Sequence, residues 1–329
     1  MMPESFRMRL IRNKPIKKDG RTMSPAMQII LYILEKRKIT AKIDNLQTQS
    51  IRDFYDATSE KLQKRPPRIK TNDYEIEVEG GHIKIREYIP KDFEPNGHSM
   101  LFFHGGGFSI GSLRTHDPVC KYFSKMLGWK IFSVEYRLAP ENRFPVPLED
   151  CDQSMDWLID NAEKFEIDTN KIAVGGDSAG GNLAACLCIK RIEEGKLQPE
   201  RQILLYPGID SKGPHASLKT FTDGYFLLTQ ELLDWFGDNY LDESDHENIY
   251  VAPLNYQKPN LLPPALVVTA GFDPLRDEGK VYADFLQDSG VKVDYIEYPN
   301  LIHGFVNFTI APECFEAMVE ISEKIKSIN

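Results

Sequence analysis

The chain has 329 residues, of which 41% are hydrophobic and 27% charged, and its formal net charge is −9. This composition is that of a globular protein with one large core, and it excludes a disordered, collagen-like or coiled-coil chain. No stretch reaches the ~18 consecutive apolar residues of a membrane-spanning helix. The apolar run at 26–34 is short and lacks a cleavage site, so we expect no signal peptide. Five cysteines without a secretion signal indicate reduced, mostly buried thiols in a cytoplasmic protein.

Charge is unevenly distributed along the chain. Residues 1–70 carry 17 Lys and Arg against 7 Asp and Glu, whereas the remainder carries 23 against 42. An acidic body repels phosphate backbones, which argues against a nucleic-acid partner. The basic segment either docks on the acidic body of its own chain or touches a membrane surface, and docking is the simpler interpretation. We expect no stable membrane insertion.

Two helices are predicted in the basic segment. Residues 22–36 have Pro25 in the first turn and a shared apolar face, and residues 50–64 carry an apolar stripe that ends before Pro66. We interpret residues 1–70 as an N-terminal helical cap segment that precedes a main domain, residues 71–329.

From residue 74 onward, short apolar runs alternate with segments of helix length. Gly80 and Gly81 predict the turn of a β-hairpin. The runs that follow, which we expect to be strands, are 100–103, 131–136, 172–175, 203–206, 265–270 and 291–298. Continuous apolar runs separated by helices predict an α/β fold, with parallel strands covered on both faces. The section between Pro207 and Pro264 is too long for one crossover and rich in aromatic residues, so a packed insertion is expected at about 208–258, here called the cap insertion.

The sequence Gly-Asp-Ser-Ala-Gly at 176–180 follows a predicted strand and precedes a helical segment at 182–191. This is the context of a nucleophile elbow, in which a serine lies on a tight turn between flanking glycines because a β-carbon would clash there. Ser178 is therefore the candidate nucleophile. Outside such a context the five-residue pattern is a common glycine turn.

The sequence His-Gly-Gly-Gly at 104–107, here called the oxyanion loop, follows the predicted strand 100–103. Consecutive glycines let backbone N–H groups point at a developing oxyanion, where each is worth about 3–4 kcal/mol in the transition state. A dinucleotide-binding pattern fails because the next glycine, Gly111, opens no suitable helix. A P-loop fails because Ser112 stands where Gly-Lys is needed.

A serine nucleophile needs a base and an acid to orient it. Of the seven histidines, His303 alone follows the last predicted strand, and Gly304 behind it permits a sharp turn. Asp273 ends the preceding strand, and Asp277 and Glu278 are rivals further along, inside a helix. The chain order Ser178, Asp273, His303 is the order found in α/β-hydrolases.

The sequence resembles the hormone-sensitive-lipase family of α/β-hydrolase esterases, bacterial family IV. The matching motifs occur in order over about residues 74–310, namely HGGGF at 104–108, EYRLAPE at 135–141, GDSAGGN at 176–182, DPLRDEG at 273–279 and HGF at 303–305. The resemblance implies an α/β-hydrolase fold, with a mostly parallel central sheet of about eight strands, helices on both faces and a helical cap.

The resemblance also implies roles for individual residues. Ser178 is the implied nucleophile, His303 the base and Asp273 the acid that orients it. The implied oxyanion hole consists of the N–H groups of Gly106, Gly107 and Ala179, and the implied supporting residues are His104, Asp177, Tyr136 and Arg137. From the residues alone, Arg137 is expected to form a buried pair with Glu141 or Asp150, and Asp177 is expected to stiffen the elbow.

The expected function is a serine carboxylic-ester hydrolase that acts through an acyl-enzyme on short- to medium-chain acyl esters of small molecules, with no metal or organic cofactor. Cys186 and Cys188 have no His or Cys cluster beside them, so zinc is not expected. The alternatives are an amidase or arylformamidase with the same triad, a non-catalytic small-molecule receptor, and a membrane-surface lipase. Family behaviour also suggests a homodimer through the edge strand near 291–298.

Overall fold

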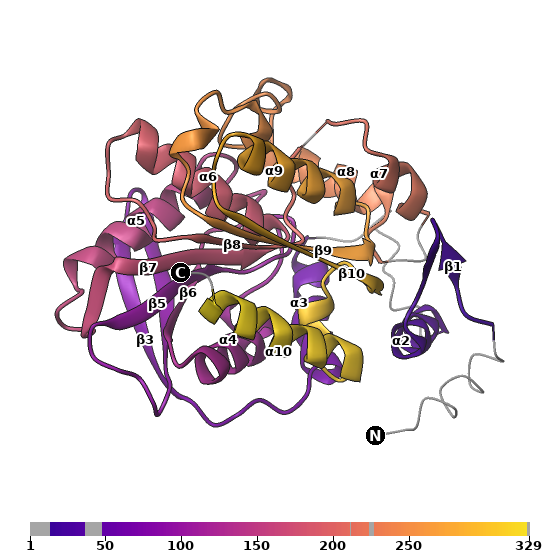
Figure 1. The fold of residues 1–329 in the computed structure, drawn as a ribbon, viewed down its shortest axis with the longest axis horizontal. Coiled ribbons are helices and arrows are strands. Elements are labelled where there is room, and N and C mark those ends of the chain that lie inside the picture. The colour runs from indigo at the N-terminus through magenta and orange to yellow at the C-terminus, as the bar shows by residue number, and fades with distance from the viewer. Residues whose placement is uncertain (1–13, 37–47, 211, 224–226, 328–329) are drawn as a thin grey trace.

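The computed structural model describes residues 14–36, 48–210, 212–223 and 227–327, arranged around one large β-sheet (Figure 1). In these ranges the sheet has eight strands in the order β10-β9-β8-β7-β5-β6-β4-β3. Their bounds are β3 Lys70–Val78, β4 Gly81–Ile89, β5 Gly97–Phe103, β6 Lys130–Glu135, β7 Ile167–Asp177, β8 Gln202–Leu205, β9 Ala265–Phe272 and β10 Val293–Ile302. The six predicted parallel strands are all present, and neighbours from β6 to β10 pair in parallel.

The predicted hairpin is β3 and β4, which pair antiparallel with Val78 opposite Gly81. β4 continues the sheet by pairing antiparallel with β6. The α/β fold class and the mostly parallel sheet predicted from the sequence are therefore confirmed.

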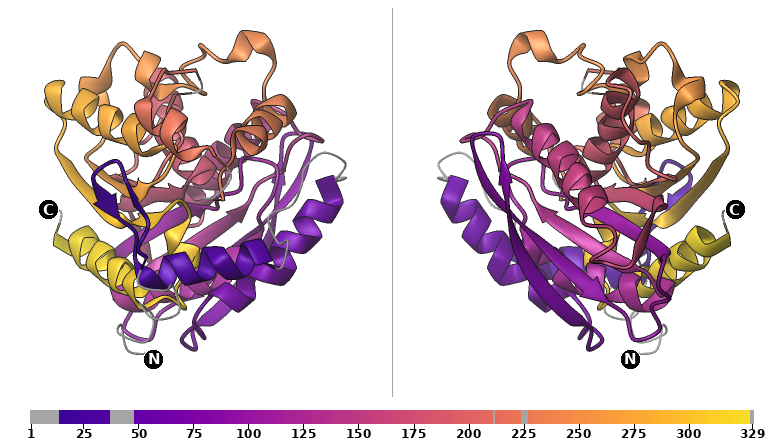
Figure 2. Two further views of the ribbon diagram at one scale, coloured as in Figure 1. Left: turned by 90° about the vertical axis from the view of Figure 1, so that its right-hand side faces the viewer. Right: turned by 90° about the vertical axis from the view of Figure 1, so that its left-hand side faces the viewer.

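Helices cover both faces of the sheet (Figures 1 and 2). One face carries α4 and α10, and the other carries α5, α6 and α9. Their bounds are α4 Leu113–Leu127, α5 Val146–Asp160, α6 Ala179–Glu193, α9 Arg276–Asp288 and α10 Pro312–Ser327. Each face has its own apolar core. Helix α6 is buried almost all round, and the five cysteines, including its Cys186 and Cys188, are buried free thiols.

The cap insertion follows β8 and lies beyond the carboxyl ends of the strands (Figure 1). Its described elements, together with the turn before β9, are α7 Ala216–Phe221, α8 Gln230–Tyr240 and the 3-10 helices η2 Glu243–Asp245, η3 Pro253–Asn255 and η4 Pro259–Leu261. A further 3-10 helix, η5 Phe305–Asn307, follows β10. None of the helices in the described ranges is long and apolar enough to cross a membrane.

The N-terminal segment contains the short strands β1 Lys17–Lys18 and β2 Arg21–Thr22, then α2 Pro25–Lys36 and α3 Thr48–Leu62. Helix α2 begins three residues later than predicted because Arg21 and Thr22 pair with β1. It packs on the α10 side, where Met27 Sδ lies 3.6 Å from Cys314 Sγ. Parts of the predicted cap segments, namely 1–13, 37–47, 211 and 224–226, lie outside the described residues.

The described part of the basic segment is docked on the body by ion pairs. Arg21 Nε lies 2.6 Å from Glu297 Oε1 on β10, and Arg52 Nη2 lies 2.7 Å from Glu141 Oε2. The Arg52 guanidinium also donates to the carbonyl oxygens of Ser109 and Ala139, both at 2.8 Å. Helix α3 is thus fixed to the segment that follows the oxyanion loop.

Candidate active site

The polar residues singled out in the sequence stand at the carboxyl ends of parallel strands. Ser178 directly follows β7, Asp273 follows β9, His303 follows β10 and His104 follows β5. The carboxyl ends of parallel strands meet at one edge of a sheet, which is where α/β proteins place their binding crevices. The topology therefore brings together residues that are up to 199 positions apart in the chain.

Ser178 lies on a strained turn between β7 and α6, with φ 56° and ψ −119°. Its N–H donates to the Leu205 carbonyl at 2.9 Å. A β-carbon added at Gly176 would collide with the backbone of Gly180 and Phe103, and one added at Gly180 would collide with Phe103. The two glycines of the motif are thus required by close backbone approach, as the pattern predicted.

His303 bridges Ser178 and Asp273. Its Nε2 lies 2.9 Å from Ser178 Oγ, and its Nδ1 lies 2.8 Å from Asp273 Oδ2. The carboxylate of Asp273 is fully buried, and its other oxygen accepts from the Leu275 N–H at 2.8 Å. Since an ionised carboxylate only accepts hydrogen bonds, His303 Nδ1–H donates to Asp273, and Nε2 is the side that accepts from the Ser178 hydroxyl.

The two rival acids have other partners. Asp277 Oδ2 accepts from the Ser217 N–H at 2.8 Å, and Oδ1 pairs with Arg276. Glu278 Oε1 accepts from the Ile209 N–H at 2.6 Å. Burial raises the pKa of Glu278 well above its ordinary value, because the surroundings disfavour its charged form.

The oxyanion loop is held in a conformation that suits glycine. Gly106 and Gly107 have φ of 127° and 55°, where a side chain is strained. The Gly106 carbonyl accepts from the N–H groups of Ser109 and Ile110 at 3.1 and 3.0 Å. The Gly105 N–H donates to Asp177 Oδ1 at 2.8 Å, so that the loop is tied to the residue before Ser178.

His104 and Tyr136 support the loop from behind. The Tyr136 hydroxyl donates to the His104 carbonyl at 2.7 Å, and the two rings stack with centroids 4.3 Å apart. Burial, together with the neighbouring His116, lowers the pKa of His104 to about 3. The ring is therefore neutral, and its Nδ1–H donates to the Gly105 carbonyl at 2.9 Å.

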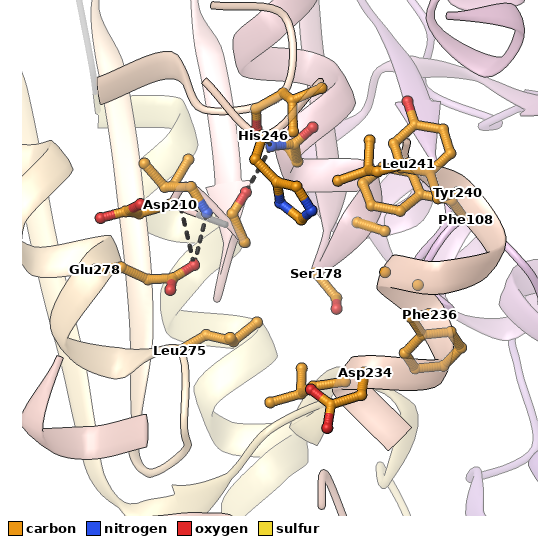
Figure 3. A pocket seen from close by; sticks show the side chains of 18 of the residues that line it. Phe108, Ser178, Asp210, Asp234, Phe236, Tyr240, Leu241, His246, Leu275 and Glu278 are labelled. Atoms are coloured by element: carbon orange, nitrogen blue, oxygen red, sulfur yellow. Dashed lines mark hydrogen bonds between the residues drawn. The ribbon is translucent and has the colours of Figure 1, made fainter. Parts of the chain in front are cut away.

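Ser178 opens into a cavity of about 690 Å³. Gly107 and Ala179 line it beside the serine, and the cap insertion and α9 supply most of the remaining wall. Figure 3 shows Ser178 between Phe236 of α8 on one side and Leu275 and Glu278 on the other. Apolar side chains in the wall include Leu218, Leu228, Leu233, Phe236 and Leu275, and the acidic ones are Asp210, Asp234, Asp238, Asp242, Glu243 and Glu278. Among the described residues, no group of three or more His, Cys, Asp or Glu could hold a metal ion.

Known proteins resemble this chain in sequence and in fold. A family model described as an α/β-hydrolase fold matches residues 100–307. The carboxylic ester hydrolase LipN of Mycobacterium tuberculosis (strain ATCC 25618 / H37Rv) is 35% identical over 296 residues, which are 88% of this chain and 78% of that protein. The arylesterase of Saccharolobus solfataricus is 34% identical, over 86% of this chain and 92% of its own. The solved esterase of Pyrobaculum calidifontis is 38% identical with a TM-score of 0.86, over 93% of this chain and 98% of its own.

The chain belongs to the α/β-hydrolase family. Within it, the relatives and the motifs place the chain among the hormone-sensitive-lipase-like esterases of family IV, which confirms the resemblance found in the sequence.

In this hydrolase, Arg137 forms an ion pair with a buried aspartate. Its guanidinium donates to both oxygens of the buried Asp150, the shortest contact being 2.6 Å, and to the Glu79 carbonyl at 2.9 Å. Of the two partners expected from the sequence, Asp150 is correct and Glu141 is wrong. Glu141 instead pairs with Arg52 of α3, a residue that sequence reasoning could not bring near it.

Sequence reasoning noted Phe236 only as one of the aromatic residues of the cap insertion, and it missed His116. Phe236 lies against Gly107 of the oxyanion loop, and His116 of α4 lies 3.1 Å from Asp177. A signal for His116 was present, because positions 113, 116, 120, 123 and 127 lie on one face of a helix and all five are buried. A histidine within such an apolar stripe needs a buried polar partner.

Proposed function

We propose that this protein is a serine carboxylic-ester hydrolase that forms an acyl-enzyme and acts on short- to medium-chain acyl esters of small molecules. The observation that carries the proposal is the hydrogen-bonded series from Ser178 Oγ through His303 to Asp273, which opens into a cavity beside the oxyanion loop. The ester-hydrolase relatives support the same reaction class.

In the first half-reaction, Ser178 Oγ attacks the ester carbonyl carbon while His303 Nε2 takes its proton. The N–H groups of Gly106, Gly107 and Ala179 stabilise the oxyanion of the tetrahedral intermediate. The intermediate then collapses. His303 gives the proton to the alkoxide oxygen as the C–O bond breaks, and the alcohol leaves an acyl-serine behind.

In the second half-reaction, water attacks the acyl-serine carbonyl while His303 takes its proton. The acid product leaves as His303 returns that proton to Ser178 Oγ. Asp273 holds the imidazole in the required tautomer throughout and stabilises the imidazolium that forms. Its burial and its second hydrogen bond, to the Leu275 N–H, fix its orientation.

The size of the cavity supports small substrates. A volume of about 690 Å³ must hold both the acyl and the alcohol group. The leucines in the wall provide an apolar surface for a short chain, whereas Phe236 closes the space above Gly107. Esters with acyl chains of a few carbons fit these limits better than long-chain triglycerides.

The test is hydrolysis of p-nitrophenyl butyrate at neutral pH by the parent and by Ser178→Ala. We expect turnover by the parent and a fall of about 10⁶ in kcat for the variant. Butyryl p-nitroanilide, the matched amide, separates an esterase from an amidase. Faster turnover of the anilide would replace the esterase proposal by the amidase alternative, and a folded parent that binds esters without turnover would support a receptor.

We further propose a cytoplasmic homodimer that pairs through β10, the last strand of the sheet. Arg21 and Ser24 contact this strand at Glu297 and Asn300, which leaves the stretch before Glu297 for pairing with a second copy. Five buried free thiols fit a reducing compartment. Light scattering on the purified protein tests the dimer, since a mass of 37.7 kDa at micromolar concentration would contradict it.

A further inference from the structure

Asp177 is a buried carboxylate with partners on four separate segments. It is 2% exposed. Its Oδ1 accepts from the Gly105 N–H at 2.8 Å and lies 3.1 Å from His116 Nε2. Its Oδ2 lies 3.4 Å from the Tyr206 hydroxyl and 3.4 Å from Asn307 Nδ2. These contacts join the oxyanion loop, α4, the end of β8 and η5 to the residue that precedes the nucleophile.

The hydrogen-bond partners of Asp177 determine whether its carboxyl group is ionised. Burial alone raises the pKa of Asp177, but His116 and the Gly105 N–H outweigh it, and the net shift is downward. An ionised carboxylate only accepts hydrogen bonds, so the 3.1 Å contact places a proton on His116 Nε2. His116 Nδ1 lies 2.8 Å from the Thr115 hydroxyl oxygen, which holds the other side of the ring.

His116 therefore acts on the site through its neighbours, mainly through Asp177 and also through the stacked ring of His104, whose centroid lies 5.5 Å from its own. Its side chain is fully buried and is not part of the cavity wall, so it cannot touch a substrate. Asp177 in turn accepts a hydrogen bond from the Gly105 N–H. The position of Gly105 sets how the backbone of Gly106 and Gly107 is oriented. With positive φ at Gly106 and Gly107, a small displacement of Gly105 reorients both of their N–H groups.

We propose that His116 is a positioning residue for ester hydrolysis. By fixing the Asp177 carboxylate against Gly105, it aims the oxyanion-loop N–H groups at the position where negative charge develops. The inference rests on the proposed function, because it assigns His116 a part in that same reaction.

A residue that acts through the oxyanion hole changes kcat and leaves KM almost unaltered. The oxyanion exists in the transition state and not in the bound ester, so only transition-state stabilisation is lost. Complete removal of one oxyanion donor costs about 10²–10³ in kcat, and a misaligned donor costs less. We expect a fall of about 10- to 100-fold.

The experiment compares His116→Asn with His116→Gln. The amide nitrogen of glutamine reaches the position of Nε2 and can donate to Asp177, whereas that of asparagine reaches only the position of Nδ1. For p-nitrophenyl butyrate, we expect His116→Asn to lose 10- to 100-fold in kcat with KM within twofold, and His116→Gln to recover most of the loss. Affinity for a trifluoromethyl ketone, which forms an oxyanion on Ser178, is expected to fall in parallel with kcat.

Ser124→Ala is the matched control. Ser124 is also buried on α4, but it bonds to the carbonyl oxygens of Tyr88 and Trp129, away from the elbow. We expect it to lower stability and to leave kcat unchanged. If His116→Asn does not fold, His116→Leu takes its place in the comparison.

Three results would overturn the inference. They are an unchanged kcat in the folded His116→Asn or His116→Leu protein, an equal loss in the Gln variant, and a rise in KM that accounts for the whole effect. Failure of the proposed function is distinct, because it requires that the parent itself lacks hydrolysis that depends on Ser178.

Discussion

The ring of Phe236 lies directly over Gly107, in the place that a β-carbon of residue 107 would occupy. Helix α8 of the cap insertion therefore rests on the oxyanion loop itself. The ring of Phe108, the next residue, stacks on Tyr240 at the end of the same helix, with centroids 3.8 Å apart. The cap and the oxyanion loop are thus packed as one unit, and the side chain of Phe236 forms the cavity wall beside Gly107.

Removal of that wall is expected to change selectivity. In Phe236→Ala, esters branched next to the carbonyl gain room above Gly107, whereas acetate does not need it. We expect the ratio of kcat/KM for p-nitrophenyl isobutyrate over p-nitrophenyl acetate to rise about tenfold, within the 10- to 200-fold that one or two methylenes are worth in a pocket. Leu232→Ala, on α8 but outside the cavity wall, is the control for a loosened cap. An equal rise in both variants would contradict the steric explanation.

The orienting acid can be tested with two neighbouring aspartates. Asp273 contacts His303, whereas Asp277 accepts from the Ser217 N–H and pairs with Arg276. Asp273→Asn is expected to lower kcat about 10⁴-fold, because it loses the tautomer control described for such triads. Asp277→Asn is expected to cost less than about threefold in the same p-nitrophenyl butyrate assay. A loss of under tenfold in Asp273→Asn would move the assignment to another acid.

Arg143 is expected to stabilise the end of the cap helix. Its guanidinium donates to the carbonyl oxygens of Asp238 and Asn239 at 2.7 and 2.9 Å, and also to the Leu241 carbonyl. Carbonyls in the last turn of a helix lack partners within the helix, so Arg143→Ala exchanges these hydrogen bonds for bonds to water and is expected to cost about 0.5–1.5 kcal/mol in the free energy of unfolding.

Urea unfolding measures this cost. The control is Arg114→Ala, which removes an exposed ion pair with Glu60 and is expected to leave the free energy of unfolding almost unchanged. Equal effects of the two substitutions would show that Arg143 is only a surface charge.

The neutral His104 predicts a loss of stability in mild acid. Its pKa is about 3 in the folded protein and about 6.5 when unfolded, so between these values the unfolded chain binds a proton that the native state does not. Stability therefore falls as pH drops below 6.5. By linkage, the contribution between pH 7.5 and pH 5 is about 2 kcal/mol.

The measurement is the free energy of unfolding in urea at both pH values for the parent and for His104→Asn, whose amide can still donate to the Gly105 carbonyl. The variant is expected to lose about 2 kcal/mol less than the parent on acidification. His82→Asn, at an exposed histidine, is expected to follow the parent. Parallel curves for all three proteins would contradict a neutral His104.

The strands, the helices and the two glycine motifs could be predicted because each depends on residues close together in the chain. An apolar run between helices gives a buried parallel strand wherever it occurs, and the glycines at 176 and 180 are required by the elbow itself. Ser178, Asp273 and His303 each follow one of these strands. Because the carboxyl ends of parallel strands lie at the same edge of a sheet, the sequence also predicted that the three residues meet there. Element ends were less certain, as α2 shows by starting at Pro25.

The choice of partners was decided only by the tertiary structure. Arg137 forms its ion pair with Asp150 and not with Glu141, because α5 packs beside the end of β6. Glu141 pairs instead with Arg52, which α3 brings close to it. Phe236 reaches Gly107, and His116 reaches Asp177, across 129 and 61 positions of sequence. A local pattern records which face of an element is buried, but not which element covers it. Which element covers a given face depends on how the crossovers pack. In this protein, that packing determines which side chains surround Ser178.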